Sequence, residues 1–260
     1  MLKDGRLRVA TYNVHKCVGL DRRERPARIA AVLREVDADV IALQEVVSHD
    51  SNASREAHQA RFIAEELGCQ FHLGENRKHK GGAYGNVVLT RLPVTHCHNH
   101  DITWKWQEPR GALRVDVSVD GPNASVVHVF NVHLGTAFVE RRHQGRKLVG
   151  DAVLRAADVK GPRVVLGDFN EWTHGLASRL LSQELRSADL RQHLRSRRTY
   201  PGPLPFMHLD HIYYDPSLVL ERLTLHRSRL SLVASDHLPL VADFRLGAPR
   251  DSQPPSIERA

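Results

Sequence analysis

Short apolar runs that end on polar residues constrain the fold of this chain more than any other feature. Residues 39–44 (DVIALQ) and 163–166 (RVVL) are too short for helices and nearly all apolar, which is typical of strands buried on both faces of a sheet. Between a first strand, predicted at residues 6–15, and the 39–44 run, a helical pattern begins at Pro26. Strands that alternate with helices in this way predict an α/β domain.

The remaining pattern adds two helices and several strands linked by hairpins. Helices are predicted at residues 55–67 and 138–157, and further strands at 85–90, 111–119, 124–133, 209–214, 218–225 and 240–246. The turn sequence of residues 120–123 (DGPN) predicts a hairpin between the two strands that flank it. Because hairpins and strand–helix–strand units are mixed, we expect mixed sheets in one domain, residues 1–247. A disordered tail rich in proline, serine and charge is expected at 248–260.

The net charge of +7 on 260 residues favours a polyanionic partner. The alternative is a charged surface that only aids solubility, and charge alone does not separate nucleic acid from anionic lipid. No run approaches the roughly 20 apolar residues that span a bilayer, the polar start does not resemble a signal peptide, and the three cysteines are scattered. We therefore expect a cytoplasmic protein without stable membrane insertion, and no protein partner is indicated.

Nearly every predicted strand has an acid, an amide or an imidazole at one end. They are Asn13, Gln44, Glu45, Asn131, His133, Asp168, Asn170, Asp210, Asp236 and His237. Taken singly, an Asn or Asp at such a place is more often a turn former or a helix cap. The repetition of the same chemistry at so many strand ends weakens that explanation, which also leaves Glu45 unexplained. Strand ends gathered at one rim are where α/β proteins place their sites.

Seven short motifs in this order resemble those of the endonuclease/exonuclease/phosphatase superfamily, over residues 6–244. They are TYNVH (11–15), LQEV (43–46), YGNVVLTR (84–91), NVHL (131–134), GDFN (167–170), LDHI (209–212) and SDHLPL (235–240). The superfamily includes deoxyribonuclease I, apurinic endonucleases, sphingomyelinases and inositol polyphosphate phosphatases. The resemblance implies a four-layer α/β sandwich, in which two mixed sheets pack face to face with helices outside. It also implies a metal-dependent phosphoester hydrolase (EC 3.1).

The resemblance assigns a metal ligand role to three of these residues. Glu45 is expected to be the principal Mg²⁺ ligand, assisted by Asn13 and Asp236. Oxygen donors suit Mg²⁺ or Mn²⁺, and the absence of a Cys/His cluster in the sequence argues against zinc. Mg²⁺ keeps several waters, so one or two protein carboxylates suffice.

The catalytic roles are also implied by the resemblance. His237 is expected beside the phosphate with Asp210 behind it, a pair that fixes the tautomer and supports a charged imidazolium. Asp168 is expected to orient or deprotonate the attacking water, Asn170 to hold a phosphate oxygen, and His133 to contact the phosphate or leaving group. The base can be Asp168 or His237, and we favour Asp168.

Asn13 and three further residues are candidates for binding the phosphate or lining the pocket. Asn13 is a candidate phosphate contact as well as a metal ligand, and Tyr84 and Asn86 are expected to line the pocket beside His133. A guanidinium matches phosphate oxygens bidentately, so Arg110 is either an extra phosphate contact or a surface arginine. Strand alternation should point His211 away from Asp210, and we leave it out of the site.

The substrate depends on loops, expected at residues 47–55, 75–85, 100–110 and 195–207. In one of them Trp104 and Trp106 flank Lys105, where they can stack bases, enter a lipid interface or pack on the domain. The first prediction is a Mg²⁺-dependent, endonuclease-like phosphodiesterase acting on nucleic acid. A phosphodiesterase or phosphatase of phospholipid head groups or inositol phosphates is the alternative. A catalytically inactive phosphate-binding module is the third hypothesis, against which the intact acids argue.

Overall fold

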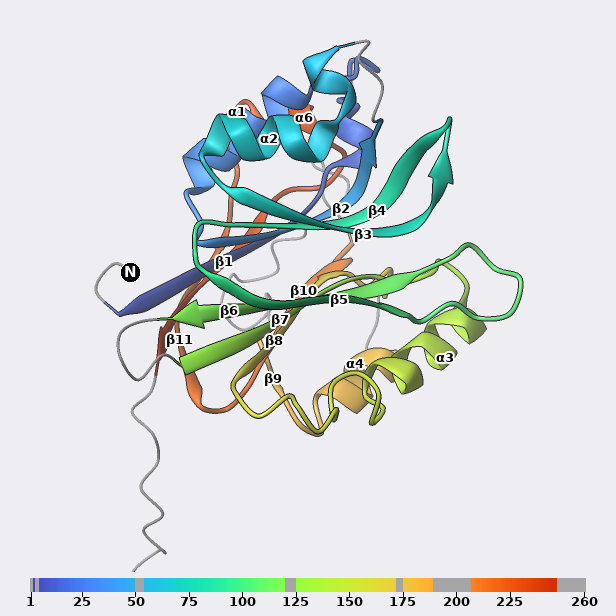
Figure 1. The fold of residues 1–260 in the computed structure, drawn as a ribbon, viewed down its shortest axis with the longest axis vertical. Coiled ribbons are helices and arrows are strands. Elements are labelled where there is room, and N and C mark those ends of the chain that lie inside the picture. The colour runs from blue at the N-terminus through green and yellow to red at the C-terminus, as the bar shows by residue number, and fades with distance from the viewer. Residues whose placement is uncertain are drawn as a thin grey trace, which may run out of the picture.

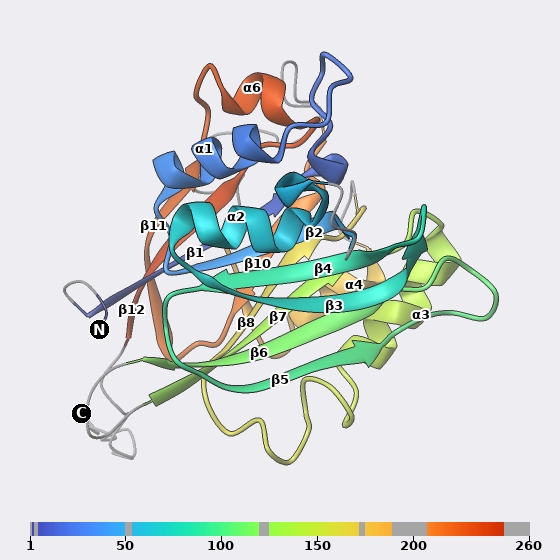
Figure 2. The same cartoon turned by 45° about the horizontal axis from the view of Figure 1, so that its top comes forward.

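Two six-stranded sheets pack face to face, and helices cover the outer face of each (Figure 1). The computed structural model describes residues 2, 5–49, 54–119, 125–171, 175–188 and 207–246. The architecture is the predicted four-layer α/β sandwich, and Figure 2 shows the same layers from a second direction.

The first sheet has the order β11-β12-β1-β2-β4-β3. Its strands are β1 (Arg6–Asn13), β2 (Val40–Ser48), β3 (Gln70–His79), β4 (Gly82–Thr90), β11 (Leu218–Leu225) and β12 (Leu240–Leu246). The helices α1 (Pro26–Val36), α2 (Gln59–Leu67) and α6 (Ser231–Ala234) lie on its outer side. Two 3₁₀ turns, η1 (His15–Cys17) and η2 (Arg55–Ala57), connect these elements.

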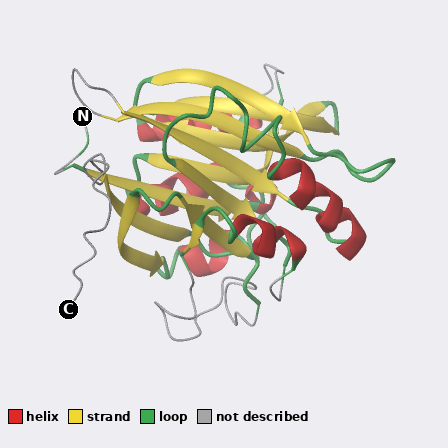
Figure 3. Ribbon diagram, turned by 90° about the horizontal axis from the view of Figure 1, so that it is seen from below, coloured by secondary structure: helices red, strands yellow, loops and turns green. Residues whose placement is uncertain are grey.

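The second sheet has the order β5-β6-β7-β8-β10-β9. Its strands are β5 (Val94–Asp101), β6 (Gly111–Val119), β7 (Ser125–His133), β8 (Arg163–Asp168), β9 (Arg186–Ser187) and β10 (Asp210–Tyr214). Seen from below, α3 (Phe138–Leu148) and α4 (Leu176–Leu181) lie over the outer side of this sheet (Figure 3). The pairs β1–β2 and β7–β8 are parallel and the other pairs are antiparallel, so both sheets are mixed, as predicted.

Three apolar clusters hold the layers together. The cluster between the sheets contains Val9, Val115 and Phe244, whereas Leu33 and Ile63 belong to the cluster between the first sheet and its helices. A third cluster packs the second sheet against α3 and α4. Because β2 contributes to both of the first two clusters, it is apolar at almost every position, which is why its sequence identified it as buried on both faces.

Polar edge strands are the main elements that sequence reasoning missed. The strands β3 and β5 each form one edge of a sheet, and they carry polar runs (GENRKH and THCHNHD) that show no apolar alternation. Backbone pairing to β4 and β6 holds them in place, and only their first residues, such as Phe71, Leu73 and Val94, pack partly buried against the apolar clusters. The expected loop at residues 75–85 is therefore wrong, since it forms the β3–β4 hairpin.

The helix predicted at residues 138–157 ends at Leu148 instead. Val149 leaves the helix and donates its amide to the carbonyls of Gly145 and Lys147, and turns follow. Val153 and Leu154 still pack in the third cluster, which explains why the apolar pattern continued beyond the helix end. The short α4, α6 and β9 were also missed, and the helix predicted at 55–67 divides into η2 and α2.

Other expectations fall outside the described residues. The strands β6 and β7 pair antiparallel as the hairpin prediction required, but its turn at 120–123 is not described. Most of the expected loop at 195–207 and the expected tail at 248–260 also lie outside the described residues.

Buried amide side chains connect the two sheets behind the strand ends. The Asn131 amide on β7 donates to the Leu43 and Val87 carbonyls of the first sheet, at 2.8 and 2.9 Å, and its Oδ1 accepts from Gln44 Nε2 at 2.8 Å. Asn86 Nδ2 crosses in the opposite direction, to the carbonyls of Gly111 and Asn131. This network fixes how the strand ends of one sheet face those of the other.

Replacing Asn131 with alanine is expected to lower the free energy of unfolding by about 3 kcal/mol, because buried carbonyls and the Gln44 amide each lose a partner. Urea denaturation followed by circular dichroism measures the change. Asn99, which bonds the Glu75 carbonyl near the sheet edges, provides the matched control, and Asn99→Ala should cost clearly less. Equal losses for the two variants would contradict a central role for the Asn131 bridge.

Candidate active site

A β-bulge at the end of β2 directs Glu45 out of the sheet. The pairing of β2 with β4 shifts register between Leu43 and Val46, and Glu45 has a positive φ of 60°. Such bulges re-aim a side chain, and a non-glycine residue in this conformation is strained. Gln44 and Val46 stay buried, while the carboxylate of Glu45 faces a cavity at this end of the sandwich.

A left-handed turn follows β1 and brings the Lys16 ammonium and the His15 ring to the same carboxylate. His15, Lys16 and Cys17 all have positive φ, between 44° and 58°. The Lys16 ammonium lies 2.8 Å from Glu45 Oε2. His15 Nδ1 lies 3.8 Å from Glu45 and 3.7 Å from Asp236, so these two carboxylates face the same space.

Asp168, at the end of β8, is the central group of the site. Strand register aligns it with His133 of the parallel β7 and with Asp210 of the antiparallel β10. Its Oδ2 accepts from Asn13 Nδ2 at 3.0 Å and lies 3.6 Å from the Nε2 atoms of both His133 and His237. The backbone amide of Asn170 donates to Oδ1 at 2.9 Å, so the GDFN motif is both a turn and part of the site.

His237 forms a buried ion pair with Asp210 behind it. The Nδ1 atom lies 2.8 Å from Asp210 Oδ2. Burial alone would lower the pKa of His237, but the charges of Asp210 and Asp168 outweigh it and raise that pKa to about 10. At neutral pH His237 is therefore an imidazolium, which donates Nδ1–H to Asp210 and directs Nε2–H toward Asp168.

His133 is held in the opposite protonation state. Arg110 Nη1 lies 3.1 Å from His133 Nδ1. Because a guanidinium only donates, Nδ1 accepts and the single ring proton is on Nε2. Burial, together with the Arg110 charge, lowers the pKa of His133 to about 4. The two imidazoles beside Asp168 thus differ in charge, a separation typical of acid–base sites.

These groups surround a cavity of about 290 Å³. Its lining consists of Asn13, His15, Glu45, His133, Thr136, Asp168, Asn170, Met207, Leu209, Asp236 and His237. All the core residues predicted from the sequence are in this set except Asp210, which lies behind His237. Sequence reasoning missed His15, although it belongs to the TYNVH motif, and it missed Thr136, Met207 and Leu209, which carry no chemical signal of their own.

Three of the predicted pocket residues lie outside the cavity lining. Arg110 is buried against His133 and also contacts Glu108, so it is not a surface arginine. The amide nitrogen of Asn86 is engaged in the bridge between the sheets, which differs from the expected place in the pocket. Tyr84 is buried under the Arg77 guanidinium, and burial raises the pKa of its hydroxyl.

His211 points away from the site, as strand alternation required. Its ring packs on Phe169 at 5.4 Å and lies near Tyr213, two residues of the cluster under α3 and α4. The Asp210 side chain faces the opposite side of β10, where His237 lies.

The donors at the cavity fit a Mg²⁺ ion held by few protein ligands. Within the described ranges no group of three or more His, Cys, Asp or Glu side chains is arranged as a metal cluster. Glu45 and Asp236 nevertheless share one space. Burial would raise the pKa of Glu45, but the charges of His133, which is protonated at such low pH, and of Lys16, together with hydrogen bonds, lower it to about 2. The carboxylate is therefore ionised at neutral pH. One or two such carboxylates with waters are what Mg²⁺ requires.

Asn13 differs from the expected metal ligand in the orientation of its amide. Its nitrogen donates to Glu45 and Asp168, at 3.2 and 3.0 Å, and its oxygen accepts the His15 amide at 3.0 Å. The oxygen that could bind a cation is therefore turned away from the carboxylates, and Asn13 holds Glu45 and Asp168 in place.

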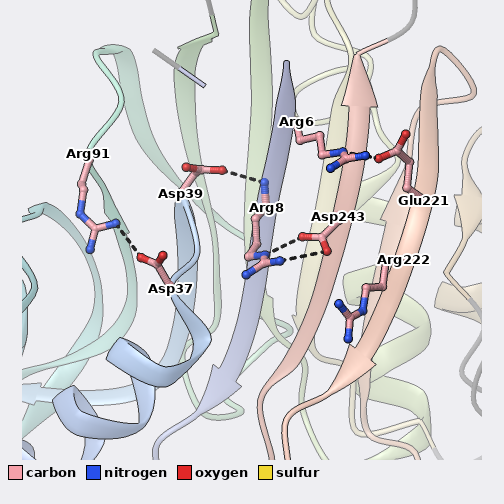
Figure 4. Close-up of a pocket in the computed structure, with 8 residues that line it drawn as sticks. All are labelled: Arg6, Arg8, Asp37, Asp39, Arg91, Glu221, Arg222 and Asp243. Atoms are coloured by element: carbon pink, nitrogen blue, oxygen red, sulfur yellow. Dashed lines mark hydrogen bonds and ion pairs between the residues drawn. The ribbon is translucent and has the colours of Figure 1, made fainter. Parts of the chain in front are cut away.

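A larger cavity of about 610 Å³ lies at the opposite end of β1, where all eight lining residues are charged (Figure 4). Arg8 pairs with Asp243 at 2.6 Å and Arg6 with Glu221 at 2.7 Å. Four arginines and four acids balance each other there. Its acids are engaged by arginines and it has no imidazole, so it lacks the acid–base groups found around Asp168.

The sandwich fold and the carboxylate–imidazole site place this protein in the class of phosphoester hydrolases. Residues 10–237 match the model of the Endonuclease/Exonuclease/phosphatase family, and the chain belongs to this family, whose members hydrolyse phosphoester bonds. No described helix is long and apolar enough to cross a bilayer.

Relatives are similar over nearly the whole chain. The chain is 31% identical over 254 residues to YbhP of Escherichia coli K12, which covers 92% of this chain and 96% of YbhP. The endonuclease/exonuclease/phosphatase of Beutenbergia cavernae shares 26% identity with a TM-score of 0.72, over 93% of this chain and 72% of that one. A mannosyl-6-phosphatase of Bacteroides thetaiotaomicron has the same fold, with a TM-score of 0.74 and 18% identity over 92% of this chain and 99% of that one.

Proposed function

We propose that this protein is a Mg²⁺-dependent phosphodiesterase whose catalytic groups meet at Asp168. One observation carries the proposal: the Asp168 carboxylate lies 3.6 Å from a neutral and from a charged imidazole. Asn13 links the same carboxylate to Glu45. A base, two donors and a cation-binding acid are thus within reach of one phosphate.

Each residue has a distinct role in this proposal. Glu45 and Asp236 would hold Mg²⁺, which when bound neutralises phosphate oxygens and stabilises charge on the leaving group. Asp168 accepts the proton of the attacking water, since His237 already carries both ring protons and cannot act as a base. His237 Nε2–H donates to a phosphate oxygen, and so does the neutral His133 from its Nε2–H. The Asn170 side chain, one N–H of which donates to the Leu134 carbonyl at 2.9 Å, donates its second N–H to the phosphate.

Arg110 and Asp210 are positioning residues. Arg110 fixes the His133 tautomer from behind, at 3.1 Å from Nδ1. Asp210 orients the His237 ring from behind and keeps that imidazole positively charged. Neither needs to touch the phosphate in order to affect the rate.

Glu45→Gln is expected to abolish most of the response to Mg²⁺ and to lower kcat/KM by roughly 10²–10³-fold, because it removes the anionic oxygen that binds the cation. Initial rates on an activated aryl phosphodiester across a Mg²⁺ titration measure this. Chelator should reduce the wild-type rate to the same level. Glu65→Gln, on the exposed side of α2, is the matched control and should behave as wild type. A folded Glu45→Gln or Glu45→Ala protein with full activity in Mg²⁺ would overturn the assignment.

Two substrate classes follow from different observations. The net charge of +7 supports nucleic acid, the substrate predicted from the sequence. The exposed side chains of Trp106, Phe138 and Val139 support a phospholipid head group as the substrate instead. Plasmid nicking and phospholipid hydrolysis, each with Mg²⁺ and with chelator, separate the two. Turnover of neither substrate nor of an aryl phosphodiester would favour the inactive binding module.

A further inference from the structure

The most exposed large apolar side chains of the described residues lie on two neighbouring elements. Trp106 is 84% exposed in the β5–β6 loop, and Phe138 and Val139 are 55% and 56% exposed at the start of α3. The Trp104 ring packs 6.4 Å from that of His143, and Lys147 Nζ donates to the Thr103 carbonyl, so the loop lies along α3. Figures 1 and 2 both show this loop projecting at the edge of the molecule beside α3.

The loop holds Trp106 outward in a defined turn. Gln107 donates its amide to the Trp104 carbonyl at 3.1 Å, and Lys105 has a positive φ of 52°. The Lys105 ammonium lies 4.9 Å from the Trp104 ring and 5.4 Å from the Trp106 ring. Cation–π contacts of this kind orient both rings around one charge. The exposure of Trp106 is therefore a feature of an ordered turn.

Unpaired positive charge surrounds these apolar side chains. Lys105, Arg142 and Arg146 are exposed, and none of them has an acidic partner in the part of the chain that the structure describes. The nearby acids are engaged, since Glu108 pairs with Arg77 and Arg110, and Glu140 is a buried residue of α3 that accepts from Gln144. Trp104, Lys105, Trp106, Phe138, Val139, Arg142 and Arg146 together form what we name the Trp106 surface.

The Trp106 surface lies at the same end of the sandwich as the candidate site. Its loop ends at Arg110, which contacts His133, and α3 begins two residues after Thr136, which lines the cavity. Glu108 further connects the loop to Arg77 of β3 and to Arg110. Anything that binds the Trp106 surface is therefore brought beside the cavity.

We propose that the Trp106 surface docks this protein on an anionic phospholipid bilayer. Exposed Trp, Phe and Val side chains can enter the boundary between head groups and acyl chains, while Lys and Arg contact the lipid phosphates. Single-stranded nucleic acid would also be attracted by the charges, but it uses aromatic stacking and gains nothing from an aliphatic Val139. The docking itself is independent of catalysis. The further idea that docking presents head-group phosphodiesters to the cavity rests on the proposed function.

Vesicle co-sedimentation of the full chain tests the docking. We expect binding to phosphatidylglycerol/phosphatidylcholine vesicles to exceed binding to pure phosphatidylcholine by at least about tenfold. The double variant Trp106→Ser, Val139→Ser should lower the partition coefficient by at least about tenfold, because it removes two inserting side chains. Val219→Ser on β11, exposed but outside this surface, is the matched control and should bind as wild type.

Two outcomes would overturn the docking: no binding to the anionic vesicles, or equal binding by wild type and the double variant. Loss of oligonucleotide binding in the double variant, with vesicle binding absent, would assign the surface to nucleic acid. Asp168→Asn protein should still bind vesicles, and the double variant should hydrolyse a soluble aryl phosphodiester at the wild-type rate. Vesicle binding by a wild type without any phosphoesterase activity would therefore refute the proposed function and leave the docking intact.

Discussion

Asp168→Asn is expected to lower kcat by roughly 10²–10⁴-fold at neutral pH with saturating Mg²⁺. The amide has nearly the same shape as the carboxylate, but it cannot take a proton from water. With a single oxygen it can accept from the Asn170 backbone amide or from Asn13, and not from both. Single-turnover rates on an activated aryl phosphodiester measure the loss. Circular dichroism and urea denaturation establish whether the variant is folded.

A matched control separates the role of Asp168 from the mere loss of a carboxylate. Asp215 follows β10 and bonds Arg163 and Ser217 at the other end of the second sheet. Asp215→Asn changes the charge by the same amount and should leave kcat unchanged. If Asp168→Asn retained more than a tenth of the wild-type rate, Asp168 could not be the base, and the 3.6 Å contacts to His133 and His237 would be structural.

The parts of the fold that bury apolar surface could be predicted from the sequence. The strands β2 and β8 are apolar because sheets or helices cover both of their faces, and that pattern is visible without any structure. The edge strands β3 and β5 depend on backbone pairing with β4 and β6, which leaves no pattern in their side chains. The end of α3 was missed for the opposite reason, because Val153 and Leu154 remain buried after the helix has ended.

The core of the site was predictable because its residues end strands that meet at one rim. Strand register then aligns His133, Asp168 and Asp210, which local sequence can only suggest. The contribution of Lys16 could not be predicted, since it depends on a left-handed turn formed without glycine. Asn86 was placed in the pocket because it lies in a motif, but its side-chain direction depends on how the two sheets pack.

The charge on His237 leads to a prediction about pH. Asp210 and Asp168 raise the pKa of His237 to about 10, against about 6.5 in an unfolded chain. A pKa raised by folding contributes stability that is fully present below about pH 6.5 and is lost as the pH rises to about 10. If the imidazolium donates to the phosphate, activity should persist through neutral pH and fall near pH 10.

Asp210→Asn is expected to lower kcat by roughly 10²–10⁴-fold at pH 9 and by much less at pH 6. Without the Asp210 charge, burial lowers the pKa of His237, so the imidazolium is lost at a lower pH and the alkaline limb of the rate profile moves toward neutrality. The pH dependence of kcat measures the shift. Asp243→Asn, which breaks the ion pair with Arg8 in the charged cavity, is the matched control.

The same change in a His237→Gln background distinguishes positioning from a direct role. If Asp210 acts through the imidazole, then Asp210→Asn should add almost nothing once His237 has been replaced, because residues that act as a unit are not additive. Independent losses that multiply would mean that Asp210 serves another group. A rate profile of Asp210→Asn that superimposes on the wild type would show that catalysis does not need the Asp210 charge, which lies 2.8 Å from the His237 ring.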